Sequence, residues 1–324
     1  MQNQMIREGS LGVAEGSPNR CVLDSLMHKQ ADLNSVPTAV CWPCSALALA
    51  GALEAAEAGI IDPILVAPEK ELRRIARTEG LEIEKYQFVE AATEEEAAAQ
   101  SADLCRTRRA QALMKGSLHT DVLMKYVLQK EAGLRTTRRV SHVYVMEVPL
   151  CDHTLFITDA AINIYPTLED KVDIVQNAID LAHVLGVALP KVAILSAVET
   201  VCAKITSTLD AAALCKMADR RQITGAILDG PLAFDTAVSA EAALVKKLHS
   251  PVAGVADILV VPDLESGNML AKQLEYLGGA RFAGIVLGAK VPIILTSRAD
   301  SAESRVASCA IGALLASKSA SVVD

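Results

Sequence analysis

Short apolar runs alternate with longer amphipathic stretches from residue 36 to near the C-terminus. Apolar runs of this length predict buried strands, and stretches with apolar residues three or four positions apart predict helices. Regular alternation of the two is typical of crossover units on a parallel sheet, so we expect an α/β fold. The predicted strands cover residues 36–42, 63–67, 110–114, 143–148, 155–158, 192–195, 224–228, 256–261, 283–287 and 292–296.

One amphipathic stretch indicates both ends of a helix. Over residues 168–185, apolar side chains such as Val175 and Ile179 recur on one stripe. Thr167 precedes this stretch and can accept a hydrogen bond from a first-turn amide. Gly186 follows it, and glycine commonly ends helices in the left-handed conformation. The sequence therefore predicts a helix over residues 168–185.

The most informative polar residues follow the apolar run 291–295. The predicted strand stops at Thr296-Ser297-Arg298, and a long amphipathic stretch begins at Ser301. Ser297 and Arg298 therefore stand between a strand and a helix N-terminus, where open α/β sheets bind ligands. Helix amides, the helix dipole and a guanidinium fork together form a site for a phosphate-like anion. We expect an enzyme that handles phosphate.

Polar residues also follow several other predicted strands. Each segment alone is more typical of an ordinary turn, in which glycine, proline, asparagine and aspartate are common. Because the carboxyl ends of parallel strands share one edge of a sheet, we expect these segments to converge on one cleft. The candidate substrate-binding residues are Lys115, Gly116, Ser141, Asp159, Asn163, Asp229, Gly230, Asn268 and Lys272.

Three groups of residues each have two interpretations. His119 and His142 are possible bases, although capping or core histidines are more common. The basic residues 135–139 form either a solvated turn or a binding site for a nucleotide phosphate. Cys41 and Cys44 have the spacing of a redox pair, but we favour two small apolar residues at a strand end. Because there is no second such pair and no paired histidine, we expect no metal site.

Composition and charge exclude some partners. Apolar residues make up 51% of the 324 residues and aromatic residues only 3%, which is typical of helices stacked on parallel strands. Few aromatic residues and a net charge of −8 argue against a nucleic-acid partner. No run is long enough to span a membrane, and residues 1–20 lack the apolar core of a signal peptide. We expect a flexible tail over 1–20 and a cytoplasmic protein.

General catalytic motifs such as GxGxxG, GxxxxGK[ST], HExxH and GxSxG are absent. Longer blocks instead resemble the phosphate acetyl/butyryltransferases from about residue 36 to residue 316. The resemblance is closest to the butyryl-type branch and to the transferase half of bifunctional enoyl-CoA hydratase/phosphate acetyltransferase proteins. The blocks are 115–120 (KGSLHT), 133–135 (GLR), 141–143 (SHV), 158–163 (TDAAIN), 207–212 (STLDAA), 227–235 (ILDGPLAFD), 262–268 (PDLESGN) and 295–301 (LTSRADS).

The resemblance implies a reaction, a fold and an assembly. The reaction is reversible transfer of a short acyl group, acetyl or butyryl, between coenzyme A and inorganic phosphate. Coenzyme A is then a substrate, and no tightly bound cofactor is expected. The implied fold resembles that of isocitrate and isopropylmalate dehydrogenases, with two αβα domains, an interdomain cleft and usually a homodimer. The first domain would comprise residues 21–138 with 289–324, and the second residues 139–288.

The resemblance also implies roles for particular residues. Arg298 would hold the phosphate oxygens, and Ser297 would donate to the developing oxyanion or the leaving sulfur. Arg135 would contact coenzyme A. A general base for the thiol is expected, and Asp300 is slightly favoured over Glu303 because it is closer to Ser297 in the chain. In the acetyl-type branch an aspartate occupies the position of Ser304, so the base stays open.

Two other functions compete with this one. An NAD(P)-dependent 2-hydroxy-acid dehydrogenase of the same fold would need clustered aspartates for a divalent cation, and the matching blocks are those of the transferases. A non-catalytic acyl-CoA-binding relative would have lost its base, and Ser304 is the position that suggests this.

We predict that Arg298→Lys lowers kcat/KM for phosphate by more than about tenfold, since lysine cannot reproduce a bidentate guanidinium fork. The assay is steady-state kinetics with phosphate varied, on a variant whose circular dichroism spectrum matches that of the parent. A smaller loss would contradict the proposed phosphate clamp.

Overall fold

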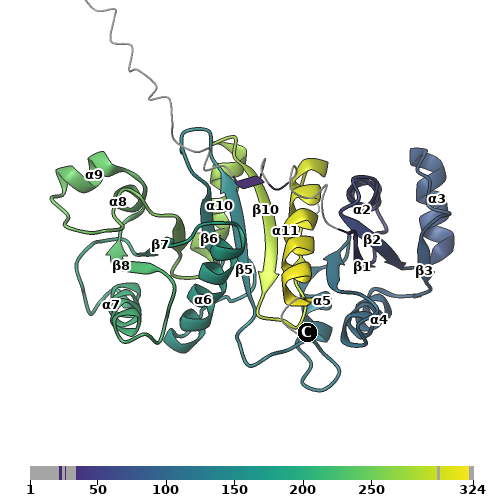
Figure 1. Cartoon of the computed structure of the whole chain (residues 1–324), viewed down its shortest axis with the longest axis horizontal. Coiled ribbons are helices and arrows are strands. Elements are labelled where there is room, and N and C mark those ends of the chain that lie inside the picture. Colours follow the sequence, from purple (N-terminus) through teal and green to yellow (C-terminus); the bar gives the residue numbers. More distant parts are fainter. Residues whose placement is uncertain (1–21, 24–25, 27–33, 298–299, 321–324) are drawn as a thin grey trace, which may run out of the picture.

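The computed structural model describes residues 22–23, 26, 34–297 and 300–320. Eleven strands among these residues form one sheet, flanked by helices on both faces (Figure 1). The sheet order is β3-β2-β1-β4-β11-β10-β5-β6-β9-β7-β8. The strands are β1 (Val36–Cys41), β2 (Ile61–Val66), β3 (Gln87–Val89), β4 (Ala112–Lys115), β5 (Ser141–Glu147), β6 (Leu155–Thr158), β7 (Lys191–Leu195), β8 (Ile227–Leu232), β9 (Ile258–Val260), β10 (Arg281–Leu287) and β11 (Ile293–Ile294).

Helices separate most successive strands, as the sequence predicts, whereas β5 and β6, and β10 and β11, are joined without a helix. No helix of the described residues is long and apolar enough to cross a membrane. The helices are α2 (Ala46–Glu57), α3 (Glu69–Glu79), α4 (Glu94–Arg106), α5 (Thr120–Val127), α6 (Leu168–Val184), α7 (Thr206–Asp219), α8 (Phe234–Val238), α9 (Ala240–Val245), α10 (Leu264–Tyr276) and α11 (Ala302–Ala320).

Helix α6 confirms the clearest sequence prediction. The Thr167 side chain accepts a hydrogen bond from the Asp170 amide, and the Asp170 side chain accepts one from the Thr167 amide, which completes a capping box. Gly186 has a φ of 96°, a conformation that glycine adopts without steric cost. The observed helix ends at Val184, one residue before the predicted end.

The mixed α/β class is confirmed, but the sheet is not wholly parallel. β10 runs antiparallel to both β5 and β11, and β5 runs antiparallel to β6. The connection between β5 and β6 contains only residues 148–154. A parallel neighbour would need a crossover of about a dozen residues or more, so a connection this short permits only an antiparallel pair. β3 is a further strand that the sequence analysis did not predict.

These strand directions correct the prediction of a single ligand-binding edge. β4 and β11 run parallel to each other, whereas β6, β9, β7 and β8 point the opposite way beyond the antiparallel pairs. Residues after β4 and β11 therefore lie at one edge of the sheet. Residues after β6 and β9 begin at the other edge. The predicted convergence of all these segments on one edge is wrong.

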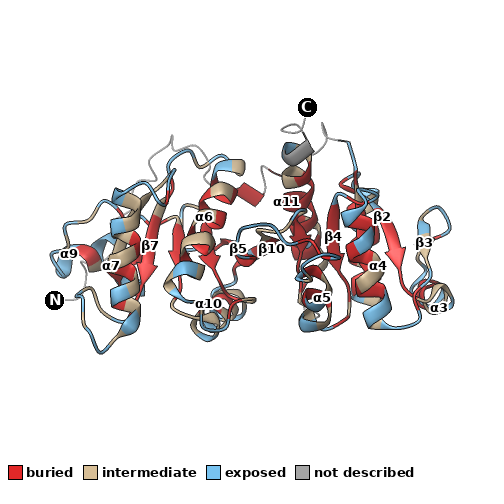
Figure 2. Ribbon diagram, turned by 90° about the horizontal axis from the view of Figure 1, so that it is seen from below, coloured by how far each residue is buried: buried red, intermediate tan, exposed pale blue. Residues whose placement is uncertain are grey.

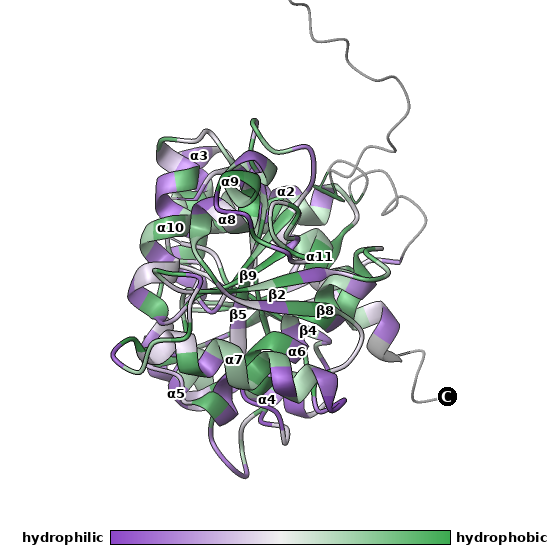
Figure 3. Cartoon of the chain, turned by 90° about the vertical axis from the view of Figure 1, so that its left-hand side faces the viewer, coloured by the Kyte–Doolittle hydropathy of each residue, from purple (hydrophilic) through white to green (hydrophobic). Residues whose placement is uncertain are grey.

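Both faces of the sheet are buried (Figure 2). One face packs against α2, α6, α7 and α11, and includes Val143, Val145 and Ile285. The opposite face packs against α4 and α5 on one side, and against α10 on the other through Tyr144, Ile157 and Phe282. Because side chains alternate along a strand, adjacent residues of β5 serve different cores. Figure 3 shows the hydrophobic strands enclosed by helices whose outer surfaces are more hydrophilic.

The predicted domain boundaries fall between β11 and β10 in the sheet order. Residues 21–138 with 289–324 supply β1 to β4 and β11, and residues 139–288 supply the other strands. The sheet continues across this boundary, so the division into two domains stays a prediction. The predicted tail, residues 1–20, lies outside the described residues.

Candidate active site

The loop after β11 contains Ser297 and Asp300, and its geometry centres on the aspartate. The Ser297 amide donates to Asp300 Oδ2 at 2.5 Å, and the Asp300 amide donates back to the Ser297 carbonyl at 3.3 Å. Asp300 is only 3% exposed. The loop therefore holds a buried carboxylate directly after a sheet strand. Arg298 lies outside the described residues.

Helix α11 begins immediately after this loop. Ser301 Oγ accepts from the Ser304 amide at 3.2 Å and lies 3.1 Å from Ser304 Oγ. These contacts satisfy an otherwise unpaired first-turn amide. Ser304, the position at which the acetyl-type branch has an aspartate, is therefore part of a helix cap in this chain.

Arg305 on α11 anchors the loop through two hydrogen bonds. Its side chain is 2% exposed, and it donates from Nη1 to Thr296 Oγ1 at 2.9 Å and from Nη2 to the Ser297 carbonyl at 2.8 Å. Gly51 on α2 leaves the space, since a Cβ there would lie 2.5 Å from Arg305 Cδ. A buried guanidinium thus joins α11 to two residues that follow β11. The sequence analysis did not single out Arg305.

Lys272 on α10 is the cation nearest to Asp300 among the described ion pairs. Its Nζ lies 3.7 Å from Asp300 Oδ1 and 2.7 Å from Glu275 Oε2. It also lies 5.5 Å from the ring centroid of Phe282. α10 starts near the opposite edge of the sheet and runs back along it, and this brings Lys272 to the loop after β11.

Burial raises the pKa of Asp300, while the Ser297 amide and the charge of Lys272 oppose that change. Asp300 Oδ1 has no hydrogen-bond partner within the described part of the chain. Burial also disfavours the charge on Lys272, but Glu275, Tyr144 and Asp300 together raise the pKa of this lysine. The site therefore holds a carboxylate of increased basicity beside a charged ammonium.

His142 and Tyr144 on β5 lie near enough to Lys272 for its charge to act on both of their pKa values. His142 is fully buried and packs edge-to-face on Tyr144, with ring centroids 4.4 Å apart. Neither ring nitrogen of His142 has a hydrogen-bond partner among the residues described. Burial lowers the pKa of His142 to about 3, and the positive charge of Lys272 acts in the same direction. Of the two interpretations, the structure favours a neutral core histidine.

A second cluster forms where β6 ends. The Asp159 carboxylate accepts from the amides of Ala161 and Ile162, each at 3.0 Å, and from Asn163 Nδ2 at 2.5 Å. Burial raises the pKa of Asp159, and these hydrogen bonds oppose the shift. Asn268 donates to the Ala160 carbonyl at 3.3 Å. Asp159, Asn163 and Asn268 are therefore brought together, as the sequence predicts, and Asn268 lies one turn of α10 before Lys272.

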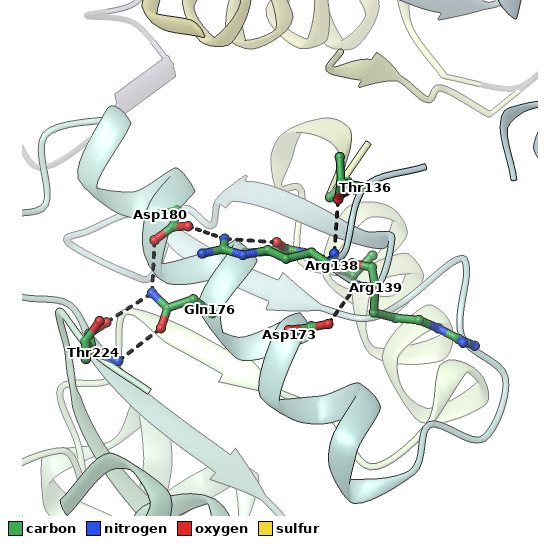
Figure 4. Close-up of polar contacts among 10 residues, drawn as sticks. Thr136, Arg138, Arg139, Asp173, Gln176, Asp180 and Thr224 are labelled. Carbon is green, nitrogen blue, oxygen red and sulfur yellow. Dashed lines mark hydrogen bonds and ion pairs between the residues drawn. The ribbon is translucent and has the colours of Figure 1, made fainter. Parts of the chain in front are cut away.

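Ser141 and the basic segment lie beside this second cluster. Ser141 Oγ accepts from Asn177 Nδ2 at 2.8 Å. Arg139 donates to Asn163 Oδ1 at 2.7 Å, and Arg138 pairs with Asp180 on α6 (Figure 4). The structure thus favours ion pairing with α6 for these two arginines.

Arg135 differs from the other arginines of this segment. It is exposed, and its backbone forms an isolated bridge with Ala289. Its side chain has no ion pair within the described residues. It therefore stays available for the predicted contact with coenzyme A.

Lys115 and Gly116 lie one strand from the Ser297 loop. Lys115 is 3% exposed, and its Nζ donates to the carbonyls of Gly116 and Leu118 at 3.2 and 3.1 Å. A Cβ on Gly116 would meet the Trp42 carbonyl at 2.4 Å. Both residues thus close the turn after β4, and Lys115 is not directed at the Asp300 carboxylate in this arrangement.

Asp229 and Gly230 are not brought to Ser297. They lie within β8, which continues past the predicted end at residue 228. β8 is six positions from β11 in the sheet order, a separation of roughly 29 Å at about 4.8 Å per strand. Asp229 Oδ1 accepts from the Gly230 amide at 2.8 Å.

The cysteine motif shows no sign of redox tuning. Burial raises the pKa of both Cys41 and Cys44 to about 12. A redox pair requires a thiol of lowered pKa, so the packing interpretation is favoured. The structure reveals a different thiol environment at Cys151 and His153, which the sequence analysis did not single out although their spacing was visible.

A pocket of about 550 Å³ adjoins the Ser297 loop. It lies between the end of α10, the start of β10 and the start of α11. Its lining combines apolar surface with polar groups of the loop, and includes Glu275, Tyr276, Phe282, Ser301, Ser304 and Val306.

Residues 95–313 match the family model described as phosphate acetyl/butaryl transferase. The chain belongs to this family. It is 60% identical over 281 residues to a phosphate acetyltransferase from Rhizobium meliloti, an alignment that covers 87% of this chain and 89% of the relative. It is 44% identical over 263 residues to a phosphate butyryltransferase from Clostridium acetobutylicum, covering 81% and 87%.

A solved structure, a branched-chain phosphotransacylase from Enterococcus faecalis V583, superposes with a TM-score of 0.74 at 32% identity. The superposition covers 86% of this chain and 99% of that one. The predicted family is therefore confirmed, and these comparisons do not favour the dehydrogenase alternative.

We predict that His142 makes the fold sensitive to acid. The unfolded imidazole, with an ordinary pKa of 6.5, takes up a proton as pH falls, whereas the folded one stays neutral until about pH 3. Stability is lost as pH falls below 6.5, and between pH 7 and 5 this loss is about 2 kcal/mol. Urea unfolding at both pH values should show that loss in the parent and in a control variant of the exposed His249, His249→Asn, but not in His142→Asn. An equal pH dependence in all three would show that His142 is protonated in the fold.

Proposed function

We propose that the chain catalyses reversible transfer of a short acyl group between coenzyme A and inorganic phosphate. The observation that carries this proposal is the buried Asp300 carboxylate, held by the Ser297 amide and facing Lys272, in a member of the phosphate acetyl/butyryltransferase family. A site of this kind provides a base and a cation within one loop–helix contact. Both are needed when a thiol and a phosphate exchange an acyl group.

In the direction of acyl-CoA synthesis, the thiol of coenzyme A must lose its proton before sulfur attacks the carbonyl of the acyl phosphate. Asp300 is the base in our proposal, because burial increases the basicity of its carboxylate. The positive charge of Lys272 favours the ionised form of that carboxylate. This positive charge also stabilises a negative charge that develops in this buried site.

The Ser297 hydroxyl donates to the oxyanion that forms when the carbonyl becomes tetrahedral, a contribution of about 2.7–4 kcal/mol for donors of this kind. Collapse of that intermediate releases phosphate. Arg298 and Lys272 neutralise the released oxygens. The reaction needs no covalent enzyme intermediate, so alignment of the two substrates supplies much of the acceleration.

We infer that the pocket beside the loop receives the acyl group. Its lining by Phe282, Tyr276 and Val306 provides apolar surface, and its contact with Ser301 and Ser304 joins it to the proposed reaction centre. A volume of about 550 Å³ exceeds what an acetyl group fills. Acetyl and butyryl groups are therefore both candidates.

We further propose a homodimer. Met269, Tyr276 and Leu277 expose 65%, 64% and 82% of their surface at or just after α10, and Ile164 and Tyr165 expose 60% and 73% nearby. The Leu264 amide at the start of α10 donates to the Ile164 carbonyl at 3.1 Å, so the two groups adjoin. Exposed apolar groups that adjoin are typical of subunit interfaces.

We infer a cytoplasmic location, because the seven cysteines described are all free, as is usual in a reducing compartment. We infer that the two sides of the sheet, divided between β11 and β10, behave as two domains.

We predict that the purified chain releases coenzyme A from acyl-CoA only when phosphate or arsenate is present. Thiol release should be measured with acetyl-, propionyl- and butyryl-CoA, each with phosphate, with arsenate and with no addition. The ratio of kcat/KM values reports the acyl preference. Absence of anion-dependent release with all three donors would contradict the proposed function, and NADH formation from 2-hydroxy acids would support the dehydrogenase.

We also predict that Asp300→Asn lowers kcat for attack of coenzyme A on acyl phosphate by about 10²–10⁴-fold, with little change in KM for coenzyme A. Glu303→Gln is the matched control. Its carboxylate is 69% exposed and lies 3.4 Å from Arg281, outside the contact with Lys272. Equal losses in both variants, or a loss in neither, would show that Asp300 is not the base.

A further inference from the structure

The connection between β5 and β6 contains a thiol and an imidazole in direct contact. Cys151 Sγ lies 3.5 Å from His153 Nδ1 and 3.9 Å from its Nε2. The Cys151 amide donates to the Val148 carbonyl at 2.8 Å, which fixes the turn that presents the thiol. Cys151 is half-buried against the core that includes β5 and β6, so the residue is partly open to solvent while its position is defined.

Both ring nitrogens of His153 face oxygen atoms that only accept hydrogen bonds. Nε2 lies 3.0 Å from the Ala256 carbonyl, and Nδ1 lies 2.8 Å from Asp152 Oδ1. A neutral imidazole has one donor nitrogen and one acceptor nitrogen, so it would leave one of these contacts as two facing lone pairs. A doubly protonated ring satisfies both contacts. The geometry therefore favours an imidazolium at His153.

A metal ion is the other explanation for such a group, because Cys151, Asp152 and His153 offer ligand atoms within 4.8 Å of one another. The distance between Nδ1 and Oδ1 decides against it. In a tetrahedral zinc site, bond lengths of about 2.0–2.2 Å separate a nitrogen and an oxygen ligand by roughly 3.3 Å. The observed 2.8 Å is the length of a hydrogen bond.

We propose that Cys151 and His153 form a thiolate–imidazolium pair, and that Cys151 is the site at which this chain is modified by small electrophiles and hydroperoxides. An imidazolium within hydrogen-bond distance stabilises the deprotonated sulfur, which is the nucleophilic form. The proposal is independent of the acyltransferase function, since neither residue contacts the Ser297 loop.

The electrostatic balance agrees with the geometry. Burial raises the pKa of Cys151, but the hydrogen bonds and charge of His153 outweigh it and leave this pKa below the ordinary value. Contact with Cys151, helped by Asp152 and the Ala256 carbonyl, raises the pKa of His153 to about 10.

The neighbouring carboxylates do not cancel the stabilisation of the Cys151 thiolate by His153. Asp152 opposes the thiolate directly, but its side chain is 93% exposed and its field is screened by water. Asp257 follows Ala256 in the segment before β9, and its carboxylate is engaged by the Lys191 amide at 2.8 Å. Other thiols behave differently, since burial raises the pKa of Cys44 and of Cys215 to about 12.

The covalent steps are simple nucleophilic displacements. With iodoacetamide, the sulfur forms a bond to the methylene carbon as the carbon–iodine bond breaks and iodide leaves. With hydrogen peroxide, the sulfur attacks one oxygen, the oxygen–oxygen bond breaks, and hydroxide leaves to become water. The sulfur is thereby oxidised to a sulfenic acid and the peroxide is reduced.

The test is the rate of carboxamidomethylation at each cysteine of the intact protein, followed by peptide mass spectrometry from pH 6.5 to 8.5. An ordinary thiol with a pKa near 8.5 should react about fifty times faster at the upper limit. For Cys151 we expect a rate that changes less than about threefold, and one that at pH 6.5 exceeds those at Cys44, Cys202 and Cys215 by at least tenfold. A pulse of hydrogen peroxide with dimedone should label the same residue.

His153→Gln should lower the rate at Cys151 at pH 6.5 at least tenfold and restore the steep pH dependence. The matched control is His183→Gln, which removes another histidine bonded to a backbone carbonyl, at 2.7 Å from Gly225, but away from Cys151. Slow labelling of Cys44 and Cys215 reports that each variant is folded. A steep pH dependence in the parent, or a rate at Cys151 unaffected by His153→Gln, would overturn the proposal.

Discussion

The antiparallel pairing of β10 with β5 and β11 is the constraint on which the arrangement of the site depends. It joins the two sides of the chain into one sheet, and together with the antiparallel pair of β5 and β6 it reverses the strand direction between them. Loops after β11 and loops after β6 therefore emerge at different edges. Only an element that returns along the sheet can join them, and α10 does so. Its Asn268 contacts the Ala160 carbonyl, and its Lys272, one turn further along, lies beside Asp300.

The proposed reaction centre is held by buried charge, which is costly in a protein interior. Arg305 is nearly inaccessible and its Nε has no hydrogen-bond partner in the described residues, while burial lowers its pKa. The partners of Arg305 are the neutral Thr296 hydroxyl and Ser297 carbonyl, and leaving a buried polar group without its partner costs about 1–3 kcal/mol, more for a charged group. Apolar residues would stabilise the fold as well or better. The charge is therefore better explained by the position it gives to Thr296 and the Ser297 carbonyl than by stability.

The sequence predicted most of the fold because its apolar runs are long and its turns are explicit. Thr167, Gly186 and the alternation of strands and helices each act through local contacts, and the structure agrees. Strand direction was mispredicted because it depends on connection length and on pairing between segments far apart, such as β5 with β10. β3 was missed because its three residues, one exposed and two half-buried, provide no apolar run. The role of Arg305 could not be predicted, since an arginine in an amphipathic stretch is normally solvated.

The site residues also differ in whether local sequence or long-range strand pairing decides their position. Ser297 was predicted from a strand followed by a helix, which is a local pattern, and Asp300 from the family resemblance and its closeness to Ser297 in the chain; the two share one loop. Lys272 was predicted for a wrong reason, as a residue following β9, and reaches Asp300 only because α10 spans the sheet. Asp229 and Gly230 are residue types that are common in ligand-binding turns, but they lie within an edge strand. Residue type alone therefore does not indicate a binding role for them. A polar residue near a strand end is therefore evidence for a shared site only once the direction of that strand and the path of the helix after it are known.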